Sequence, residues 1–274
     1  MNKYLIIGGI IIVFIGTLAL CAPFIAPYDP LVFQDLPHEF APPSSQHILG
    51  QGERGGDIFS YLVYGARLSL IVAIITTFIT CFTGLILGSL SAYFGSWVDT
   101  LIMRIVDILL AFPGFLFAIC IAAFLTPSIA NVILALSVTG WTSYARLVRG
   151  QILSVKEKEY VQSARALGLS HVRIILKHIW PNIFAPLLVQ ASFGMASVII
   201  AESSLSFLGV GIGEASSWGL MLDEARGHIL NLSRSHLLFP PLIAIMTTVL
   251  GFNFLGDGLI QKLDPTFRGR KYVI

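Results

Sequence analysis

The chain has 274 residues, of which 55% are hydrophobic and only 12% are charged, and its formal net charge is +2. Because an ordinary soluble domain carries about 25% charged residues, this composition excludes a water-soluble globule and indicates a protein whose solvent is lipid. The chain has neither a basic tail of the kind that binds nucleic acid nor an acidic tail, so no nucleic-acid partner is expected.

The N-terminus begins like a signal peptide but lacks a cleavage site. Lys3 precedes an apolar run from Leu5 to Leu20, and Cys21 follows it. Leu20 stands where lipoprotein processing needs a small residue, and no A-x-A sequence follows. We therefore expect an uncleaved first membrane span.

Five windows of the sequence contain no Asp, Glu, Lys or Arg, namely 4–28, 68–98, 108–145, 178–201 and 235–256. A hydrocarbon core of about 30 Å needs roughly 20 helical residues, so four of the windows hold one span each. The third has 38 residues, and one helix of that length would reach about 57 Å. Thr126-Pro127-Ser128 supplies a turn within it. The sequence predicts an all-α polytopic membrane protein with six spans, the third and fourth forming a hairpin.

The basic residues predict the orientation. Six spans place both termini on one side, and that side carries 13 Lys and Arg residues, seven of them between Arg146 and Lys177, against four on the other side. By the positive-inside rule the side with 13 is cytoplasmic. Two polar segments, about 27–67 and 203–236, then lie outside. The first is proline-rich and becomes helical from about Gly56, and the second holds a short helix ending near Arg226.

Residues 159–182 form the longest charged, amphipathic passage. Tyr160, Ala164 and Leu167 stand at i, i+4 and i+7, with Val161 beside them, and so predict one face of a short helix. Gly168 ends that helix as a C-terminal cap.

A second helix is predicted after this turn. Ser170 is placed to cap it, and Pro181 marks where the fifth span begins. Its apolar stripe contains Val172, Ile175, Leu176 and Ile179, with Arg173 and Lys177 opposite. From the residues alone, an amphipathic helix pair lying on the lipid headgroups is an equal alternative.

The passage also resembles the EAA loop of ABC-importer permeases, a short helix that docks into a groove of the cytoplasmic ATPase. Gln162-Ser163-Ala164 occupy the E-A-A positions, Gly168 is the motif glycine, and Pro181 matches the closing proline. The resemblance implies that the ATPase-coupling residues are Tyr160, Gln162, Ser163, Ala164, Arg165, Leu167 and Gly168.

The similarity extends over nearly the whole chain to the C-type permeases of the peptide/nickel branch, which have the type I importer architecture. The matching stretches are His47-Ile48-Leu49-Gly50, Tyr64-Gly65-Ala66-Arg67-Leu68-Ser69-Leu70, Arg104-Ile105-Val106-Asp107, Ser204-Leu205-Ser206-Phe207-Leu208-Gly209 and Asn253-Phe254-Leu255-Gly256-Asp257. The chain departs where the branch reads LGTD and GRD, because Gly52 and Gly56 replace an acidic and a basic residue.

This resemblance implies a non-enzymatic permease subunit in a bacterial inner membrane, forming half of a pathway for di- or oligopeptides. Its implied partners are a homologous permease, two ATP-binding subunits that hold ATP and Mg, and a periplasmic or lipid-anchored binding protein. Residues 1–67 are expected to form the first span and outward segment, 68–265 the core with its coupling loop at about 150–182, and 266–274 a cytoplasmic tail. The alternatives are a nickel-chelate permease of the same branch and a self-sufficient secondary transporter or channel.

Four polar residues lie in or near the predicted spans. Asp107 is interpreted as an i, i+3 partner of Arg104, with a functional intramembrane carboxylate as the alternative. Glu202 is expected either to face the pathway or to extend into solvent. Asn253 and Asp257 are expected to line the inner mouth of the pathway or to tie their helix to a partner.

No cofactor or metal is expected in this chain. The cysteines Cys21, Cys81 and Cys120 lie apart in apolar runs, as packed hydrophobes do. His228 and His236, near Asp223 and Glu224, lack metal-ligand spacing. The sequence has no GxSxG stretch and no phosphate-binding GxxxxGK[ST], so ATP hydrolysis is assigned to partners.

Overall fold

The computed structural model describes residues 2–30, 32–212, 216–228 and 231–263. Apart from an isolated bridge between Gln51 and Asp57, the regular structure of these residues is helical. Its α-helices are α1 (Lys3–Leu20), α2 (Ala22–Ile25), α3 (Ile58–Phe94), α4 (Ser96–Ala111), α5 (Gly114–Phe124), α6 (Ile129–Val155), α7 (Glu159–Ala166), α8 (His171–Ile174), α9 (Trp180–Phe207), α10 (Trp218–Arg226) and α11 (Ser235–Leu263). The 3₁₀ turns are η1 (Leu36–His38), η2 (Glu53–Gly55) and η4 (Leu232–Arg234), and η3 (Ile175–Ile179) is a π-helical segment.

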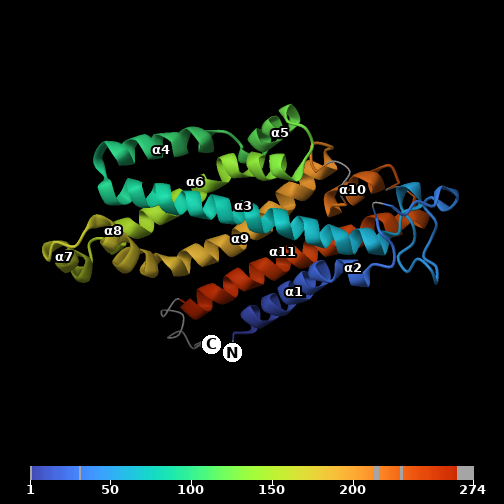
Figure 1. Ribbon diagram of the computed structural model, residues 1–274, viewed down its shortest axis with the longest axis horizontal. Coiled ribbons are helices and arrows are strands. Elements are labelled where there is room, and N and C mark those ends of the chain that lie inside the picture. The colour runs from blue at the N-terminus through green and yellow to red at the C-terminus, as the bar shows by residue number, and fades with distance from the viewer. Residues whose placement is uncertain (1, 31, 213–215, 229–230, 264–274) are drawn as a thin grey trace, which may run out of the picture.

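The long helices lie side by side along one axis of the molecule. The proline-rich segment and α10 are at one end of this axis, and α7 and α8 are at the other (Figure 1). By length and composition, α1, α3, the continuous helix His171–Phe207 and α11 can each cross a membrane. The helix pair α4 and α5 is a fifth candidate span. The predicted class, an all-helical polytopic membrane protein, is therefore confirmed.

The third span differs from the prediction, which placed one straight helix before the turn at Thr126. The structure instead has α4 and α5 bent by 83°. The break lies at Phe112 and Pro113, where Phe112 is extended and Pro113 caps α5. A residue before proline avoids the helical conformation, so Pro113 ends α4 inside an apolar run that shows no other break.

The predicted turn between α5 and α6 is present. Helix α5 ends at Phe124 and α6 begins at Ile129. The Ser128 hydroxyl accepts a hydrogen bond from the Asn131 backbone N–H at 3.2 Å, and the Asn131 amide donates to the Thr126 carbonyl at 2.7 Å. Side-chain caps of this kind satisfy the free N–H groups of the first turn, and they set the antiparallel direction of α5 and α6.

Helix α3 is the central helix of the fold and contacts most of the other long helices. It runs without interruption for 37 residues, and its small residues let α6 approach closely. A Cβ atom added to Gly84 would clash with Tyr144, and one added to Gly88 would clash with the Ala145 carbonyl and Val148. Small residues serve this purpose in membrane helix pairs because lipid does not drive association by the hydrophobic effect.

The passage after α7 continues into the fifth span instead of forming a separate helix. Helices α8 and α9 are joined through η3. Pro181 has no N–H to continue the α-helical bonding, and the Asn182 side chain donates to the His178 carbonyl at 2.7 Å. A π-helical turn is one way in which a helix accommodates a missing backbone hydrogen bond.

Two of the predicted segment boundaries can be compared with the described residues. The boundary expected at residues 67–68 lies within α3, which begins at Ile58. The predicted tail, 266–274, lies outside the described residues, as do the basic residues Arg268, Arg270 and Lys271.

Candidate functional site

The end of α7 is a closed helical turn at the tip of the molecule. Gly168 has φ +75°, a value that favours glycine. The backbone N–H of Leu169 donates to the Ala164 carbonyl at 3.2 Å, and that of Gly168 donates to the Arg165 carbonyl at 3.0 Å. These bonds satisfy the last carbonyls of the helix, as in a glycine C-terminal cap, so the chain reverses where the glycine was predicted to turn it.

Only part of the α7 face that periodicity predicted is exposed. Val161 is 0% exposed and Ala164 is 4% exposed, and both pack into a cluster with residues of α3, α6 and α9. Leu167, by contrast, is 82% exposed. The remaining predicted coupling residues, Tyr160, Gln162, Ser163, Arg165 and Gly168, are also exposed. The prediction that Ala164 and Leu167 share an exposed face was therefore wrong. The small side chain of Ala164 packs α7 against the rest of the protein.

The predicted stripe of the following helix also needs correction. Ile174 and Ile179 are fully buried and Ile175 is partly buried, whereas Val172 and Leu176 are exposed. The π-helical turn changes the residues that share a face, so a 3.6-residue period no longer applies. Ser170 does stand at the N-terminal cap, but its side chain makes no capping hydrogen bond.

The segment around α7 is fastened to the end of α3. The Tyr93 hydroxyl lies 2.8 Å from His171 Nδ1, and the Arg165 guanidinium lies over the Tyr93 ring at 5.5 Å. A second group of contacts lies one turn away. Trp180 Nε1 donates to Ser89 Oγ at 3.0 Å, and Lys156 Nζ donates to the Ala92 carbonyl at 3.2 Å. Sequence reasoning missed this attachment, because its partners are 64 to 91 positions apart.

Asp107 does not pair with Arg104, as was predicted. Its Oδ1 accepts from Arg146 of α6 at 2.8 Å, and both side chains are more than half exposed. A neighbouring pair, Asp99 and Arg149, makes two bonds of 2.6 Å. Both pairs join α4 to α6, so Asp107 belongs to a helix-to-helix contact.

Glu202 is fully buried, which contradicts both the pathway-facing and the solvated interpretations. Its exposure is 0%, and its carboxylate oxygens accept from Ser69 Oγ at 3.0 Å and Ser206 Oγ at 2.9 Å, with Ser203 Oγ at 3.5 Å. No basic group of the described residues lies within ion-pair distance of it. Hydroxyl donors thus replace a cation around this carboxyl group and join α3 to α9.

Asn253 and Asp257 lie on α11 near its end. Asn253 is half-buried and Asp257 is exposed. Neither side chain makes a hydrogen bond or ion pair with the described residues, so the structure brings neither into a site within this chain.

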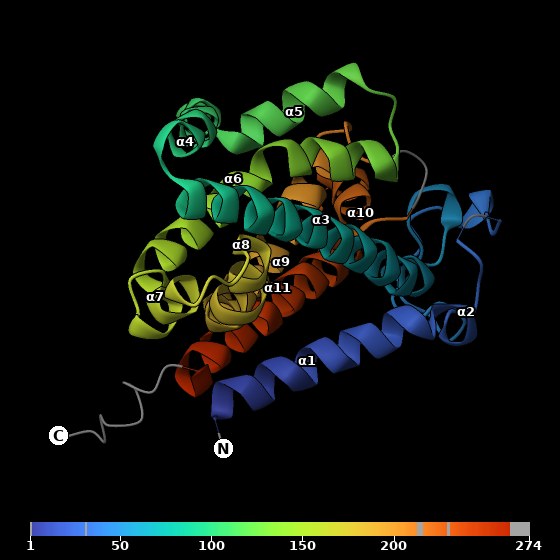
Figure 2. The ribbon, with the colours of Figure 1, turned by 60° about the vertical axis from the view of Figure 1, so that its left-hand side comes forward.

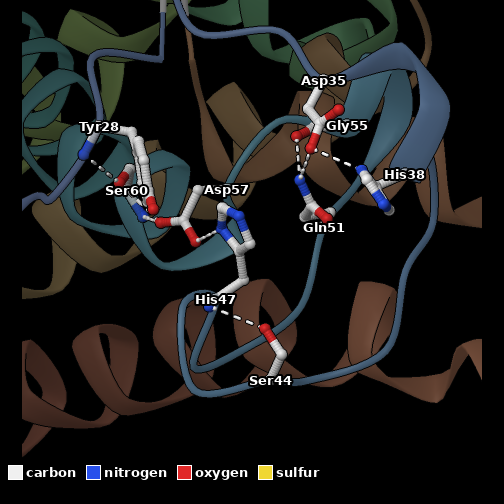
Figure 3. A network of polar contacts seen from close by, with 9 residues as sticks. All are labelled: Tyr28, Asp35, His38, Ser44, His47, Gln51, Gly55, Asp57 and Ser60. Atoms are coloured by element: carbon white, nitrogen blue, oxygen red, sulfur yellow. Dashed lines mark hydrogen bonds and ion pairs between the residues drawn. The ribbon is translucent and has the colours of Figure 1, made fainter.

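The proline-rich segment is held together by buried polar contacts that sequence reasoning did not assign (Figure 3). The Asp57 carboxylate accepts from the Ser60 backbone N–H at 2.8 Å and from its hydroxyl at 2.7 Å, and it lies 2.9 Å from His47 Nδ1. These bonds cap the first turn of α3. The spacing of Asp57 and Ser60 just before an apolar run is a recognisable capping signal.

The two glycines that depart from the related permeases face each other. The Gly52 N–H donates to the Gly56 carbonyl at 2.8 Å. Beside them, Gln51 Nε2 donates to the Gly55 carbonyl at 2.9 Å and lies 3.4 Å from Asp35. The hydrogen bond between Asp35 and His38 lowers the pKa of that exposed carboxyl group. Backbone and amide contacts therefore occupy the place where an acidic and a basic residue were expected.

An acidic cavity of about 530 Å³ lies between this segment and α10. Glu53, Asp223 and Glu224 line it together with Arg54 and Tyr61. Burial, with repulsion from Glu53, raises the pKa of Glu224 to about 7. Among the described residues, no group of three or more His, Cys, Asp or Glu side chains is placed to hold a metal ion.

These features define a class of protein. Long apolar helices, with a closed polar segment at one end and a small exposed helix at the other, are the form of a multi-pass membrane protein. Comparisons with known proteins specify the class further.

Residues 84–269 match the family described as "Binding-protein-dependent transport system inner membrane component", and residues 1–43 match "N-terminal TM domain of oligopeptide transport permease C". The chain is 38% identical over 268 residues to the "Dipeptide transport system permease protein DppC" of Bacillus subtilis (strain 168), covering 97% of this chain and 83% of that protein. It is 41% identical over 263 residues to the "Glutathione transport system permease protein GsiD" of Shigella dysenteriae serotype 1 (strain Sd197), covering 96% and 86%. In fold it is similar to a chain of the inward-facing MetNI methionine ABC transporter, with a TM-score of 0.63 at 18% identity, covering 76% of this chain and 98% of that chain.

The chain therefore belongs to the family of binding-protein-dependent transport system inner membrane components. It is a permease subunit of an ABC importer, a multi-pass protein of the bacterial cytoplasmic membrane. The family consists of non-catalytic membrane subunits that work with an ATPase and a substrate-binding protein. A self-sufficient secondary transporter or channel is excluded by this membership.

Proposed function

We propose that this subunit forms half of the membrane pathway for a small peptide. The observation that carries the proposal is the near-full-length similarity to two permeases named for a dipeptide and for glutathione, which is itself a short peptide. No feature of the described residues favours the nickel-chelate alternative, whose candidate ligands do not cluster.

The topology is six spans with both termini in the cytoplasm. Helix α6 has 27 residues and so reaches about 40 Å, enough for a sixth span beside the five candidates. The Asn2 side chain donates to the Gly258 carbonyl at 2.9 Å, which supports placing the start of α1 and the end of α11 on the same side. The excess of basic residues around α7 supports a cytoplasmic position for that side.

The exposed tip of α7 is the part that couples to the ATPase. Leu167, with Tyr160 beside it, presents apolar surface on a turn whose other side is anchored by Val161 and Ala164. Exposed apolar side chains on an anchored helix suit a groove in a partner protein. A contact with a cytoplasmic partner also explains why a chain with so little polar surface has a charged segment there. ATP and Mg are bound by the partner subunits, not by this chain.

Displacement of this tip reaches the spans through α3. The contacts of Tyr93, Ser89 and Ala92 with the coupling segment join it to a helix that continues unbroken to the proline-rich segment (Figure 2). A rigid helix moves as one body when one end is displaced.

The remaining partners follow from this arrangement. A homologous permease completes the pathway, two ATP-binding subunits contact the coupling helices, and a periplasmic or lipid-anchored binding protein docks on the outward segments. Asn253 and Asp257, which have no partner within the described residues, are available to line the pathway or to contact the second permease.

Leu167→Asp tests the coupling role. The variant should assemble normally because this side chain is exposed, but a carboxylate in an apolar contact costs about 1–3 kcal/mol. We expect uptake and substrate-stimulated ATP hydrolysis to fall at least about tenfold in proteoliposomes that contain the whole complex and its binding protein. Ala164→Asp is unsuitable, because it would disrupt the internal packing of α7.

The matched control is Val172→Asp on α8, where the native side chain is 65% exposed. This variant should retain transport if the contact is confined to the tip of α7. Full coupled transport by an assembled Leu167→Asp complex would contradict the proposal. Equal losses in both variants would instead indicate that the whole segment lies on lipid.

A further inference from the structure

A cavity of about 280 Å³ opens beside the outer half of α3. It lies between α3, the start of α6 and the chain just before α10, and it belongs neither to the coupling segment nor to the acidic cavity. Its lining is mostly apolar, with polar groups from two parts of the chain. The residues that concern its chemistry are Arg67, Ser216, Tyr64, Ile71 and Ile129.

Two of these polar groups lack partners among the described residues. Ser216 is 7% exposed, and its Oγ makes no hydrogen bond. Arg67 makes no hydrogen bond, ion pair or ring contact with any described residue, whereas Arg146 and Arg149 pair with carboxylates of α4. A buried hydroxyl without a partner is costly. Arg67 is exposed and lines the same cavity, so an anionic ligand there can accept hydrogen bonds from both groups.

The cavity continues into an exposed apolar track on α3. Ile71 is 41% exposed, Ile74 is 51% exposed and Phe78 is 68% exposed. They follow Arg67 on the same side of the helix. From Arg67 to Phe78 the helix rises about 16 Å, close to half of a hydrocarbon core of about 30 Å. Arg67 and Tyr64 thus stand where headgroups meet hydrocarbon, a depth at which tyrosine is enriched.

We propose that this cavity binds the phosphate of a membrane phospholipid, whose acyl chain lies along Ile71, Ile74 and Phe78. Arginine and a hydroxyl are suited to phosphate oxygens because both donate hydrogen bonds and arginine adds charge. A free anion would satisfy Arg67 and Ser216 but would leave the apolar track uncovered. A phospholipid satisfies both features at one depth.

The test is native mass spectrometry of the intact transporter complex titrated with phosphatidylglycerol. Arg67→Gln should weaken binding of the tightest lipid about tenfold, which corresponds to about 1.4 kcal/mol. Ser216→Ala should weaken it by a smaller factor, and Arg67→Lys should retain most of it. Arg226→Gln is the matched control, because this exposed arginine pairs with Asp223 and lies outside the cavity. It should bind lipid as the native complex does.

Two further probes separate the sources of the signal. Diacylglycerol, which has the same tails but no phosphate, should bind equally to the native and Arg67→Gln complexes. Millimolar inorganic phosphate should fail to displace phosphatidylglycerol. Unchanged phosphatidylglycerol affinity in assembled Arg67→Gln complexes would overturn the proposal, as would displacement of the lipid by inorganic phosphate, which would make the site one for a free anion.

Discussion

The two ends of α3, which are its outer and inner ends in the proposed topology, make different kinds of contact. At the outer end, Asp57 caps the helix, the Trp218 indole donates to the Leu62 carbonyl at 2.9 Å, and Ser69 donates to Glu202. These contacts are buried within this chain. At the inner end, Tyr93 and Ser89 contact a segment whose tip, Leu167, is almost wholly exposed.

The difference indicates that the two ends of α3 serve different purposes. The outer contacts fix α3 within the subunit, whereas the inner contacts connect it to a segment with an exposed surface. Since the same unbroken helix carries both, the proposed coupling role requires that displacement at the inner end moves the outer end too. The comparison predicts that changes at the outer end affect stability and changes at the inner end affect coupling.

The largest effect is expected from Glu202→Ala. Removing the carboxyl group leaves the hydroxyls of Ser69 and Ser206 without their acceptor and opens a cavity between α3 and α9. We expect a loss of about 2–4 kcal/mol of stability, measured as a lower thermal midpoint of the purified complex. Glu202→Gln keeps an acceptor and should lose much less. Equal melting of the Ala variant and the native protein would show that the outer end does not depend on this contact.

A smaller effect, on coupling, is expected from Tyr93→Phe. The change removes one hydrogen bond, to His171, worth about 0.5–1.5 kcal/mol, and leaves the ring in place. The amount of substrate transported per ATP hydrolysed should fall while the complex still assembles. Tyr4→Phe is the control, since this exposed tyrosine of α1 contacts Phe254 through its ring. An unchanged ratio in Tyr93→Phe would remove α3 from the coupling route.

The smallest effect is expected at Glu224, on the outward side. Its pKa is about 7 in the folded protein against an ordinary value of 4.5, so the folded state holds this proton more tightly than the unfolded state. Stability should therefore decrease as pH rises from about 4.5 to about 7 and then level off. Because Glu224 is only partly buried, solvent screens the effect, and we expect the smallest change in melting midpoint of the three. Glu224→Gln should flatten this dependence on pH. An identical pH profile in the variant would contradict the shift.

Much of the fold could be predicted from the sequence, because apolar length and turn residues determine it locally. Each of the candidate spans contains one of the charge-free windows or part of one, Thr126-Pro127-Ser128 located the turn between α5 and α6, and Gly168 located the turn that ends α7. The bend at Pro113 was missed because both sides of it are equally apolar. Pro113 itself held the decisive information, because the residue before a proline avoids the helical conformation.

The site was harder to predict because burial depends on partners far away in the sequence. Ala164 and Leu167 are both apolar and share a helical face by spacing, yet only Ala164 is buried, in a cluster that includes residues of α3, α6 and α9. Glu202 resembled a surface carboxylate because its hydroxyl partner Ser69 lies 133 positions away. Asp57 was predictable, since its capping partner Ser60 is three residues on.

The most direct test of the central claim is photocrosslinking from the tip of α7. A benzophenone attached to Leu167→Cys, in a chain whose three native cysteines are replaced by serine, should form an adduct with the ATPase subunit in the intact complex. The same group at Val172→Cys should give little of that adduct. Adducts of Leu167→Cys with lipid alone, in complexes that retain the ATPase, would contradict the claim that this tip is the coupling element.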